Sequence, residues 1–439
     1  MPLRFTLAGS LRVEHGPKGE TRILRTKRSR SARIEEPKNS RSRNDMTTRR
    51  TFLLQGAGLA SAPAIHGQNT KKNWRVGVIG HTGRGNFGHG LDTVWNLLDE
   101  TSIAAVADAN PGGLAKAKQK LKTDRTYADY REMLAKERPE IVAVCPRHVD
   151  QRVPMITAAC EMGAKGIYVE KPFARSLEET DQIAEACAKA GTKLAIAHRN
   201  RYHPAMPVLK KLIKEGVVGD VLEMRGRGKE DRRGGGEDLW VLGTHILDLY
   251  NYLAGKPLTC SAEMLQEGRP VTKRDVNEGN EGLGPLAGDE VHARWRMENG
   301  WTACFDSVRN RGSKQAGFGL QIIGNQGIID IRNDREPLIH FMKDSPWEPA
   351  KADRKWLPIT SAGIGKPEPQ DIRGTVHNHV AATRDLLDSI KNNRSPICGV
   401  NEGISTVEFV SSVFESHRLQ GASVSIPLNT RVNPLLLLS

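Results

Sequence analysis

Five short apolar runs, separated by helical segments, constrain the fold of this 439-residue chain more than any other feature. The runs are rich in β-branched residues and nearly continuous, as parallel strands buried on both faces should be. They cover residues 75–79, 103–107, 141–144, 166–169 and 193–197. Between the last two runs, Ser176 to Glu179 form a helix capping box and Gly191 provides a C-cap. This alternation predicts an α/β domain with a doubly wound parallel sheet over about residues 73–200.

The second half changes character at about residue 201. Pairs of alternating strands are joined by turns that contain Asn299-Gly300 and Gly324-Asn325, and such turns are typical of hairpins. We therefore predict an α+β domain with a mostly antiparallel open sheet over residues 201–426, followed by a C-terminal tail, 427–439. The expected elements are strands at 291–297, 301–308, 320–323 and 327–331, helices at 204–214, 376–389 and 404–416, and a loop at 343–372.

The formal charge of +14 belongs mostly to the N-terminal end of the chain. Residues 1–45 carry twelve Lys or Arg against five Asp or Glu, and residues 46–72 add four basic residues and no acid. Residues 73–439 keep a net charge of only +3. The main body therefore has the charge of an ordinary soluble enzyme, and we expect no nucleic-acid partner.

Residues 46–68 have the layout of a twin-arginine export signal. Arg49 and Arg50 precede an apolar run that begins at Phe52, and small residues follow as a cleavage region. We therefore expect export to a periplasmic or other extracytoplasmic location. Residues 1–45 lack periodicity and are expected to be disordered. Either Met46 is the true start, which we favour, or the extension is real and masks the signal.

Several protein classes are excluded by what the sequence lacks. The six cysteines form no C-x-x-C pair, so we expect neither a zinc site nor a thioredoxin-like motif. The spacing of His377 and His379 does not indicate a metal site either. Because no stretch of 18 apolar residues occurs, we expect no membrane span.

A glycine-rich turn directly follows the first predicted strand. It contains the candidate cofactor-binding residues Gly80, Thr82, Gly83, Arg84 and Gly85. Glycines here allow a tight turn and a close approach of the backbone to a pyrophosphate, and a helix should follow with its free N–H groups toward the phosphates. Asp108 ends the next strand, where a carboxylate binds ribose hydroxyls and repels a 2′-phosphate. The motif predicts a Rossmann site for NAD, with NADP as the alternative.

Two candidate catalytic side chains come from different halves of the chain. The fourth strand ends at Glu170-Lys171-Pro172, at the sheet edge where ligands bind, and Pro172 is a candidate for a cis bond. His245 lies on a helix predicted to follow a run of glycines. A desolvated lysine near another cation has a lowered pKa, so it can remove a hydroxyl proton, and a nearby histidine can relay that proton.

These motifs, in this order, resemble the glucose–fructose oxidoreductase/inositol dehydrogenase (Gfo/Idh/MocA) family over about residues 73–426. The resemblance implies a tightly bound nicotinamide cofactor and a sugar-like or cyclitol substrate that lies over the second sheet. It also implies self-association through that sheet. It makes Lys171 the acid/base at the reacting hydroxyl and His245 its partner. Pro146 and His148 would line the nicotinamide side, and Glu170 would lie near the cofactor ribose.

Val241 is a departure from this family, because many members have an aspartate one turn before the histidine. Two acids are candidates to replace it. Asp248 follows His245 by three residues on the same helical face, and Asp238 precedes it, although Asp238 is equally a candidate helix N-cap. The sequence does not choose between them.

Other residues are candidates for binding the substrate. Arg201 and Tyr202 follow the last parallel strand, and we add them to Asp238 and His245 as substrate-binding candidates. The basic segment 225–233 is either a solvated loop or a lid whose arginines bind anionic groups.

Three functions are compatible with the sequence. The first is an exported NAD(P)-dependent oxidoreductase that transfers hydride between a carbohydrate or cyclitol hydroxyl and nicotinamide. The second is a glycosidase that uses bound NAD for transient oxidation and elimination. The third is a non-catalytic sugar-binding protein, a hypothesis motivated by the valine at position 241.

Overall fold

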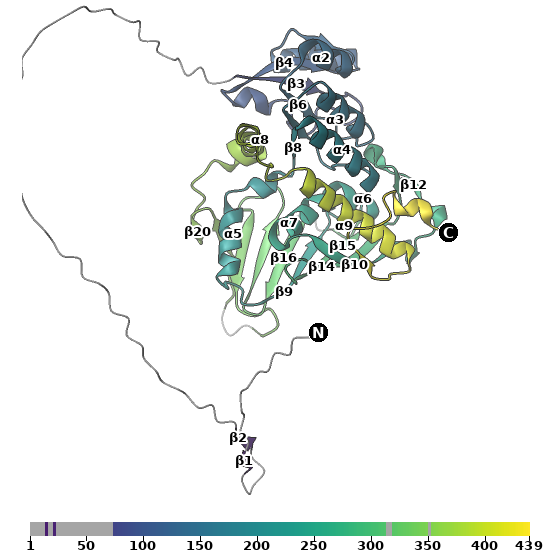
Figure 1. Cartoon of the computed structure of the whole chain (residues 1–439). Coiled ribbons are helices and arrows are strands. Elements are labelled where there is room, and N and C mark those ends of the chain that lie inside the picture. The colour runs from purple at the N-terminus through teal and green to yellow at the C-terminus, as the bar shows by residue number, and fades with distance from the viewer. Residues whose placement is uncertain (1–13, 16–20, 23–72, 313–317, 350–352) are drawn as a thin grey trace, which may run out of the picture. The chain divides into compact units, whose positions relative to one another are not determined.

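The structure, a computed structural model, describes residues 14–15, 21–22, 73–312, 318–349 and 353–439 (Figure 1). The chain divides after residue 68 into two compact units. In the first unit the described residues form one antiparallel strand pair, β1 (Glu14–His15) with β2 (Thr21–Arg22). The rest of the predicted disordered extension, 1–45, and the predicted export signal, 46–68, lie outside the described residues.

The second unit begins with a six-stranded parallel sheet, as predicted. Its strands are β3 (Trp74–Ile79), β4 (Thr101–Ala107), β5 (Thr126–Tyr127), β6 (Ile141–Val144), β7 (Gly166–Val169) and β8 (Lys193–Ile196). The order β5-β4-β3-β6-β7-β8 is that of a doubly wound dinucleotide-binding sheet. All five predicted runs are strands, whereas β5 is too short to carry a pattern that the sequence could reveal.

Helices cover both faces of this sheet. Those from the same domain are α1 (Pro111–Leu121), α2 (Tyr130–Glu137), α3 (Arg152–Glu161) and α4 (Leu177–Ala190). A further helix, α8 (Val380–Lys391), comes from the C-terminal half and packs on β7 and β8, in the same core as Trp95. The chain therefore returns to the first sheet after it has formed the second.

No α-helix follows β3, contrary to the prediction from the glycine-rich turn. Residues 80–93 form turns, and only a short 3-10 helix, η1 (Val94–Leu97), comes after them. Positive φ angles recur through this segment, at Gly83, Gly85, Asn86, Gly88 and Gly90. A backbone in the left-handed region cannot continue a right-handed helix, so the glycines replace the first turns of the expected helix.

The second domain is built on one large mixed sheet with the order β11-β10-β14-β15-β9-β16-β17-β18-β19-β20. Its strands are β9 (Val221–Arg227), β10 (Pro257–Gln266), β11 (Arg269–Pro270), β14 (Glu290–Met297), β15 (Thr302–Val308), β16 (Gly319–Gly324), β17 (Gly327–Arg332), β18 (Ile339–Lys343), β19 (Leu357–Thr360) and β20 (Gly363–Ile364), with β21 (Val424–Ser425) paired to β10. Within this path only β15 and β9 pair in parallel, so the predicted antiparallel character is confirmed.

The helices α5 (Ala205–Lys214), α7 (Thr244–Ala254) and α9 (Val400–Arg418) lie along one face of this sheet (Figure 1). Smaller elements are β12 (Asn277–Glu278), β13 (Pro285–Leu286), the 3-10 helices η2 (Arg199–Tyr202), η4 (Lys273–Asp275), η5 (Asn280–Gly282) and η7 (Pro434–Leu437), and the π-helix η6 (Arg373–His377). No helix in the described ranges has both the length and the apolar character that crossing a membrane requires.

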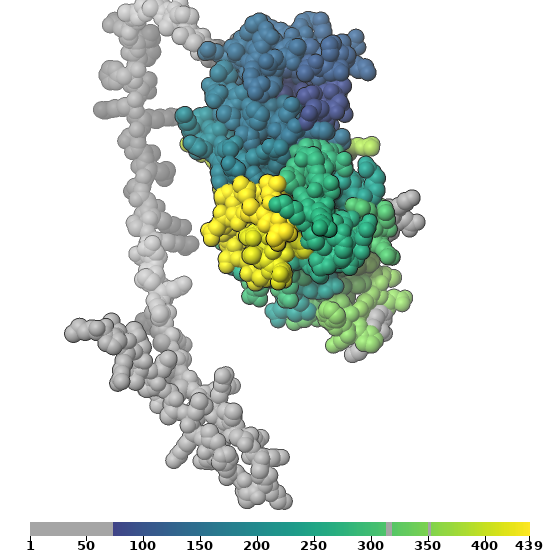
Figure 2. Space-filling model, turned by 90° about the vertical axis from the view of Figure 1, so that its right-hand side faces the viewer, coloured from purple at the N-terminus to yellow at the C-terminus, as the bar shows by residue number. Residues whose placement is uncertain are grey.

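One prediction for the C-terminal half is wrong in part. The expected loop at 343–372 contains β19 and β20, which extend the sheet at its edge, where a residue such as Pro358 is tolerated. The C-terminal segment 427–439 packs on the second domain, because Leu435 is fully buried and η7 contacts α9. Figure 2 shows these last residues, in yellow, lying against the blue first domain and the green part of the second.

The predicted helix that carries His245 has an unusual start. A three-residue turn, α6 (Gly236–Asp238), passes into a π-helix, η3 (Leu239–Gly243), and then into α7. In a π-helix each carbonyl reaches one residue further along the chain, so the helix widens locally, and such turns occur frequently at functional sites. Val241 lies in the middle of this widened turn.

Candidate active site

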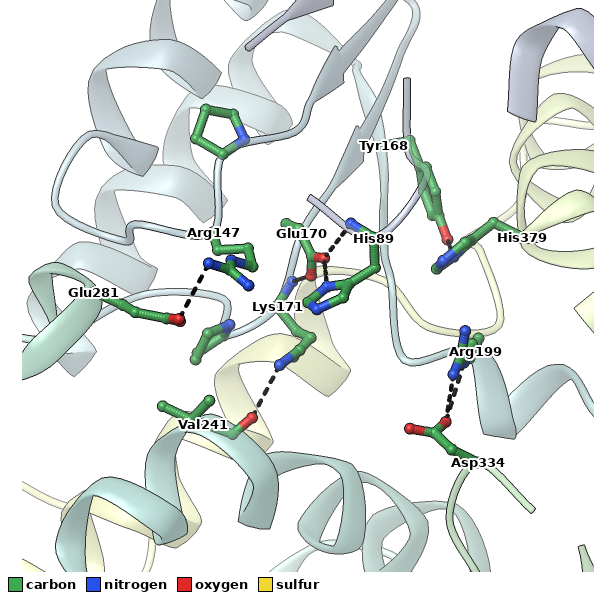
Figure 3. A network of polar contacts seen from close by, with 12 residues as sticks. His89, Arg147, Tyr168, Glu170, Lys171, Arg199, Val241, Glu281, Asp334 and His379 are labelled. Atoms are coloured by element: carbon green, nitrogen blue, oxygen red, sulfur yellow. Dashed lines mark hydrogen bonds and ion pairs between the residues drawn. The ribbon is translucent and has the colours of Figure 1, made fainter. Parts of the chain in front are cut away.

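Lys171 lies at the carboxyl end of β7, pointing toward the π-helix of the second domain (Figure 3). Its Nζ donates a hydrogen bond to the backbone carbonyl of Val241 at 3.0 Å, and the residue is only 7 % exposed. The Lys171–Pro172 bond is cis, as predicted. Burial lowers the pKa of Lys171, and the negative charge of Glu170 opposes that effect only in part. The lysine therefore has the desolvated environment expected of a general base.

Glu170 is a buried carboxylate bonded to the glycine loop. Its Oε1 accepts hydrogen bonds from the backbone N–H of His89, at 3.1 Å, and from Nδ1 of the same histidine, while Oε2 accepts from the backbone N–H of Lys171 at 2.7 Å (Figure 3). Burial alone would raise the pKa of Glu170, but the bond from His89 and the charge of Lys171 outweigh burial and lower it to about 2. Both oxygens are thus used within the protein, and the expected position of Glu170 near the cofactor ribose stays a prediction.

Arg152 is a buried cation that the sequence analysis did not single out. Its guanidinium donates to three backbone carbonyls, those of Glu170, Pro172 at 2.7 Å and Pro146 at 3.0 Å. It therefore fixes the backbone on both sides of Lys171 and joins it to the predicted nicotinamide-side turn. Burial lowers the pKa of Arg152 to about 10. In sequence Arg152 looks like an ordinary first-turn residue of a helix, so no pattern indicated this role.

His245 is half-buried, and its ring packs edge to face against the ring of His198, with the two centroids 5.3 Å apart. The ring of Phe318 also packs against His245, at a centroid distance of 6.1 Å. Burial, and next the positive charge of Lys171, hold the pKa of His245 well below its usual value. The Nδ1 of His245 has no hydrogen-bond partner among the described residues. The structure thus places His245 and Lys171 in one neighbourhood, and it adds His198, which the sequence analysis missed.

Neither acid proposed to replace the missing aspartate is bonded to His245 in the structure. The carboxylate of Asp248 accepts hydrogen bonds from Nε and Nη2 of Arg201 at 2.7 to 3.1 Å, and both side chains are buried. Asp238 is fully buried elsewhere and accepts from the backbone of Glu230 at 2.9 Å and from Ser307 Oγ at 2.7 Å. Burial raises the pKa of Asp238. Each aspartate is bound by a residue that is far from it in the sequence, and the spacing along a helix cannot reveal such partners.

The other predicted substrate-binding residues are also engaged within the fold. Arg201 is held by Asp248, and the hydroxyl of Tyr202 contacts Asp385 at 3.3 Å and the backbone N–H of Cys398 at 3.2 Å. In segment 225–233, three arginines pair with nearby acids: Arg225 with Glu223, Arg227 with Glu230, and Arg233 with Asp231. These three arginines are therefore held in local ion pairs, so the segment does not present them as a lid of free cations.

The nucleotide side combines a glycine loop and a small cavity. The cavity, about 210 Å³, lies beyond the carboxyl ends of β3 and β4 and is lined by Gly80, Asp108, Tyr130 and Arg131 among others. Both carboxylate oxygens of Asp108 accept from the N–H of Thr82 at 3.1 Å, and one accepts from its hydroxyl at 2.6 Å. Asp108 is therefore already bound to the glycine loop. Ribose hydroxyls would donate to the same carboxylate, either beside Thr82 or in its place. A concave site with a carboxylate at this edge fits a dinucleotide.

The glycine loop is also bound to the turn after β6. Arg84 pairs with Asp150, His81 Nδ1 contacts Gln151 at 2.7 Å, and a Cβ at Gly85 would collide with the backbone of Arg147 at 2.3 Å. Glycine is thus required at position 85, whereas around Gly83 a Cβ would meet no atom within 4 Å. His148, on the same turn, has a pKa lowered by burial and next by Arg84. The contacts expected of Arg84 with a phosphate and of His148 with the nicotinamide stay predictions.

No metal is implied at this site. Within the described ranges, no three His, Cys, Asp or Glu side chains are grouped in a way that would hold a metal ion. A cavity of about 990 Å³ lies on the outer face of the second sheet and includes Arg225, His292 and Arg294 in its lining. The chemistry is therefore concentrated where Lys171 meets the helix that carries His245.

A glycine loop on a doubly wound parallel sheet, with a desolvated lysine at the carboxyl edge and histidines from a second domain, defines an NAD-binding oxidoreductase. Family comparison agrees: residues 74–198 match the NAD-binding Rossmann domain of the Gfo/Idh/MocA oxidoreductase family, and residues 210–426 match its C-terminal alpha/beta domain. The chain belongs to this family and is an enzyme of the oxidoreductase class with NAD as its cofactor.

Two curated relatives and one solved structure illustrate the likeness. Levoglucosan dehydrogenase of Pseudarthrobacter phenanthrenivorans is 26 % identical over 289 residues, which are 60 % of this chain and 72 % of that protein. Myo-inositol 2-dehydrogenase of Thermotoga maritima is 22 % identical over 276 residues, 60 % of this chain and 77 % of that protein. A solved levoglucosan dehydrogenase, in complex with NADH and levoglucosan, has a TM-score of 0.64 and 21 % identity, covering 81 % of this chain and 100 % of the other.

Proposed function

We propose that this protein is an NAD-dependent dehydrogenase that oxidises a secondary hydroxyl of a carbohydrate or cyclitol, with Lys171 as the acid/base and His245 assisting. The contact between Nζ of Lys171 and the carbonyl of Val241 carries this proposal. A neutral amine has two N–H donors and one lone pair. When one N–H is held by the carbonyl, the lone pair is directed away from Val241 and is available to a substrate hydroxyl.

The chemistry then divides between cofactor and protein. The bound nicotinamide supplies a hydride acceptor for the carbon that carries the hydroxyl. Lys171 takes the hydroxyl proton, and as an ammonium it would stabilise remaining negative charge on oxygen. Arg152 holds the backbone around Lys171, and His89 with Glu170 joins that backbone to the glycine loop. In the reverse direction Lys171 returns the proton to the alcohol oxygen.

The test begins with the cofactor. Purified protein is denatured and the released nucleotide is identified; the enzyme is then assayed at 340 nm with added NAD and a panel that includes levoglucosan and myo-inositol. We expect NADH formation with at least one sugar or cyclitol, lost in Lys171→Ala and kept in Lys391→Ala, an exposed lysine that pairs with Glu100. Cleavage of a glycoside without net NADH formation would support transient oxidation and elimination instead. Sugar binding that Lys171→Ala leaves unchanged, with no turnover, would support a binding protein.

Export through a twin-arginine signal is a separate proposal. It is supported by the order of Arg49-Arg50, apolar run and small residues. This export route carries folded proteins, so the cofactor would travel bound and be recycled in place. N-terminal sequencing of native protein from the cell envelope should find a start after the small-residue region. A mature protein that retains residues 49–54 would contradict export.

Self-association through the large sheet is proposed on the polar character of its outer face. Arg225, Arg294 and Arg296 are exposed there, and His292 bonds Asp306 at 2.6 Å and Glu290 at 2.7 Å. Charges of both signs on one face can pair with a second copy across a two-fold axis. Light scattering at low and high salt tests this: we expect an oligomer that Arg294→Glu weakens, and a monomer under both conditions would refute it.

A further inference from the structure

His198 stands out because it is a buried polar side chain with unused hydrogen-bonding capacity. It lies between β8 and η2, and it is 2 % exposed. Neither Nδ1 nor Nε2 has a hydrogen-bond partner among the described residues. A buried polar group without a partner costs free energy, so such groups in native proteins are normally met by water or by a ligand.

The neighbourhood of His198 points to a ligand. Its ring lies edge to face on His245, whose Nδ1 is also without a partner in the described part of the chain. Lys171 is close enough to lower the pKa of both imidazoles, after burial, which has the largest effect on each. Burial brings the pKa of His198 to about 4, although the charge of Asp248 acts in the opposite direction. Both rings are therefore neutral at physiological pH.

Neutral imidazoles suit hydroxyl groups. Each ring has one N–H donor and one acceptor nitrogen, and a sugar hydroxyl is likewise both donor and acceptor. Three unpartnered nitrogens on two rings beside the catalytic lysine can therefore accept and donate to neighbouring hydroxyls of a polyol. A carboxylate at position 241 would offer only acceptors, so the two rings provide a different hydrogen-bonding pattern in its place.

We propose that His198 is a substrate-binding residue, which together with His245 binds the hydroxyls adjacent to the reacting carbon of a polyhydroxy substrate. This inference rests on the proposed dehydrogenase function. It extends that function by naming the second imidazole and the chemical feature that it recognises, a vicinal diol. Asp248, which is occupied by Arg201, then acts on this pair through its charge near His198 and not as a direct partner of His245.

Stability gives a first test that needs no substrate. In His198→Phe an aromatic ring of similar size replaces the imidazole and removes both unpartnered nitrogens. We expect the melting temperature of the full chain to stay the same or rise, because function and not stability has kept the imidazole. A purely structural histidine would give the opposite result, a clear fall in melting temperature, which would overturn the proposal.

Ring signals give the second test. Nitrogen-15 spectra of histidine side chains are recorded on the NADH-loaded protein while glycerol, myo-inositol or levoglucosan is added. We expect the His198 and His245 signals to shift with at least one of these polyols. His417 is the internal control, because its two nitrogens are already engaged with the N–H of Met264 and the carbonyl of Val271. No change at His198 with any polyol, glycerol included, overturns the proposal.

Kinetics separate this inference from the proposed function. For a sugar that reduces NAD, His198→Phe should raise KM about tenfold, as expected for the loss of one or two hydrogen bonds, with little effect on NAD affinity. His198→Asn, which keeps one donor and one acceptor, should recover part of the loss. Unchanged KM in His198→Phe would refute the role of His198 while the dehydrogenase stands. Ring shifts without NAD reduction by any polyol would refute the dehydrogenase while the binding role stands.

Discussion

The Nζ of Lys171 is bonded to the main-chain carbonyl of Val241, 3.0 Å away, across the boundary between the two domains. The lysine belongs to the cofactor sheet and the valine to the π-helix before His245. The second domain therefore helps to position the base. The contact answers why an apolar residue can occupy position 241: the backbone, and not the side chain, binds the lysine.

The first prediction concerns the pH dependence of oxidation. Because burial lowers the pKa of Lys171, the base form is present at pH values below the usual pKa of lysine, 10.5. We expect the rate of alcohol oxidation to rise with pH and to level off below pH 10.5. Lys171→Ala should lower kcat by about 10² to 10⁴ and remove this pH dependence. An unchanged pH profile in Lys171→Ala would assign the base elsewhere.

The second prediction restores the missing acid. Val241→Asp places a carboxylate beside Lys171, which raises the pKa of the lysine and moves the rise in oxidation rate to higher pH. Val241→Asn has nearly the same shape without the charge and should leave the profile in place. Since Val241 is buried, both variants should be less stable, and thermal unfolding of the pair separates that shared cost from the charge. Equal profiles for both variants would contradict the electrostatic explanation.

A third prediction uses Glu170. Its pKa is about 2 in the folded protein, below its usual value of 4.5, so its stabilising contribution is complete above pH 4.5 and is lost as the pH falls toward 2. The contribution is on the order of 3 kcal/mol, given about 1.4 kcal/mol per pKa unit. Urea unfolding from pH 7 to pH 3 should show this loss, and Glu170→Gln should be less stable at pH 7 and depend less on pH. A wild-type slope retained in Glu170→Gln would assign the effect to other acids.

The fourth prediction compares Asp238, which ends α6, with Asp248 on α7. Asp248→Asn leaves the buried guanidinium of Arg201 without its counter-charge, so we expect a loss of about 3 to 5 kcal/mol in the free energy of unfolding. Asp238→Asn should cost much less, because the carboxyl forms no ion pair within the described part of the chain and burial already raises its pKa. Denaturant unfolding measures both. A larger loss in Asp238→Asn would reverse this assignment.

A fifth prediction addresses Arg152. Arg152→Lys keeps the charge but cannot reproduce a planar fork that reaches three carbonyls, so we expect a loss of about 2 to 4 kcal/mol and a lower kcat. Arg309→Lys, at an exposed position, is the control and should change stability by less than about 0.5 kcal/mol. If both variants unfold at the same denaturant concentration, Arg152 does not hold the turn around Lys171.

The sequence predicted what depends on periodicity and on local motifs. The parallel sheet, the position of Lys171 at its edge and the cis bond at Pro172 are of this kind, because strand runs and a Glu-Lys-Pro turn are visible without tertiary contacts. The helix after the glycine loop was wrongly predicted. Glycine permits a positive φ but does not require it, so the sequence does not show that this segment forms turns and not a helix. Asp248 and Arg201 were predicted to face the site but bind each other, and only the fold brings them together.

Val241 has a consequence for how this site can change over time. A contact made by a main-chain carbonyl is kept by whichever amino acid occupies the position, provided that the widened helical turn is preserved. A substitution at residue 241 therefore need not release the lysine, although a polar side chain at this buried position lowers stability. Alignments that compare side chains alone would report a lost catalytic residue here, although the atom that holds the base is still present.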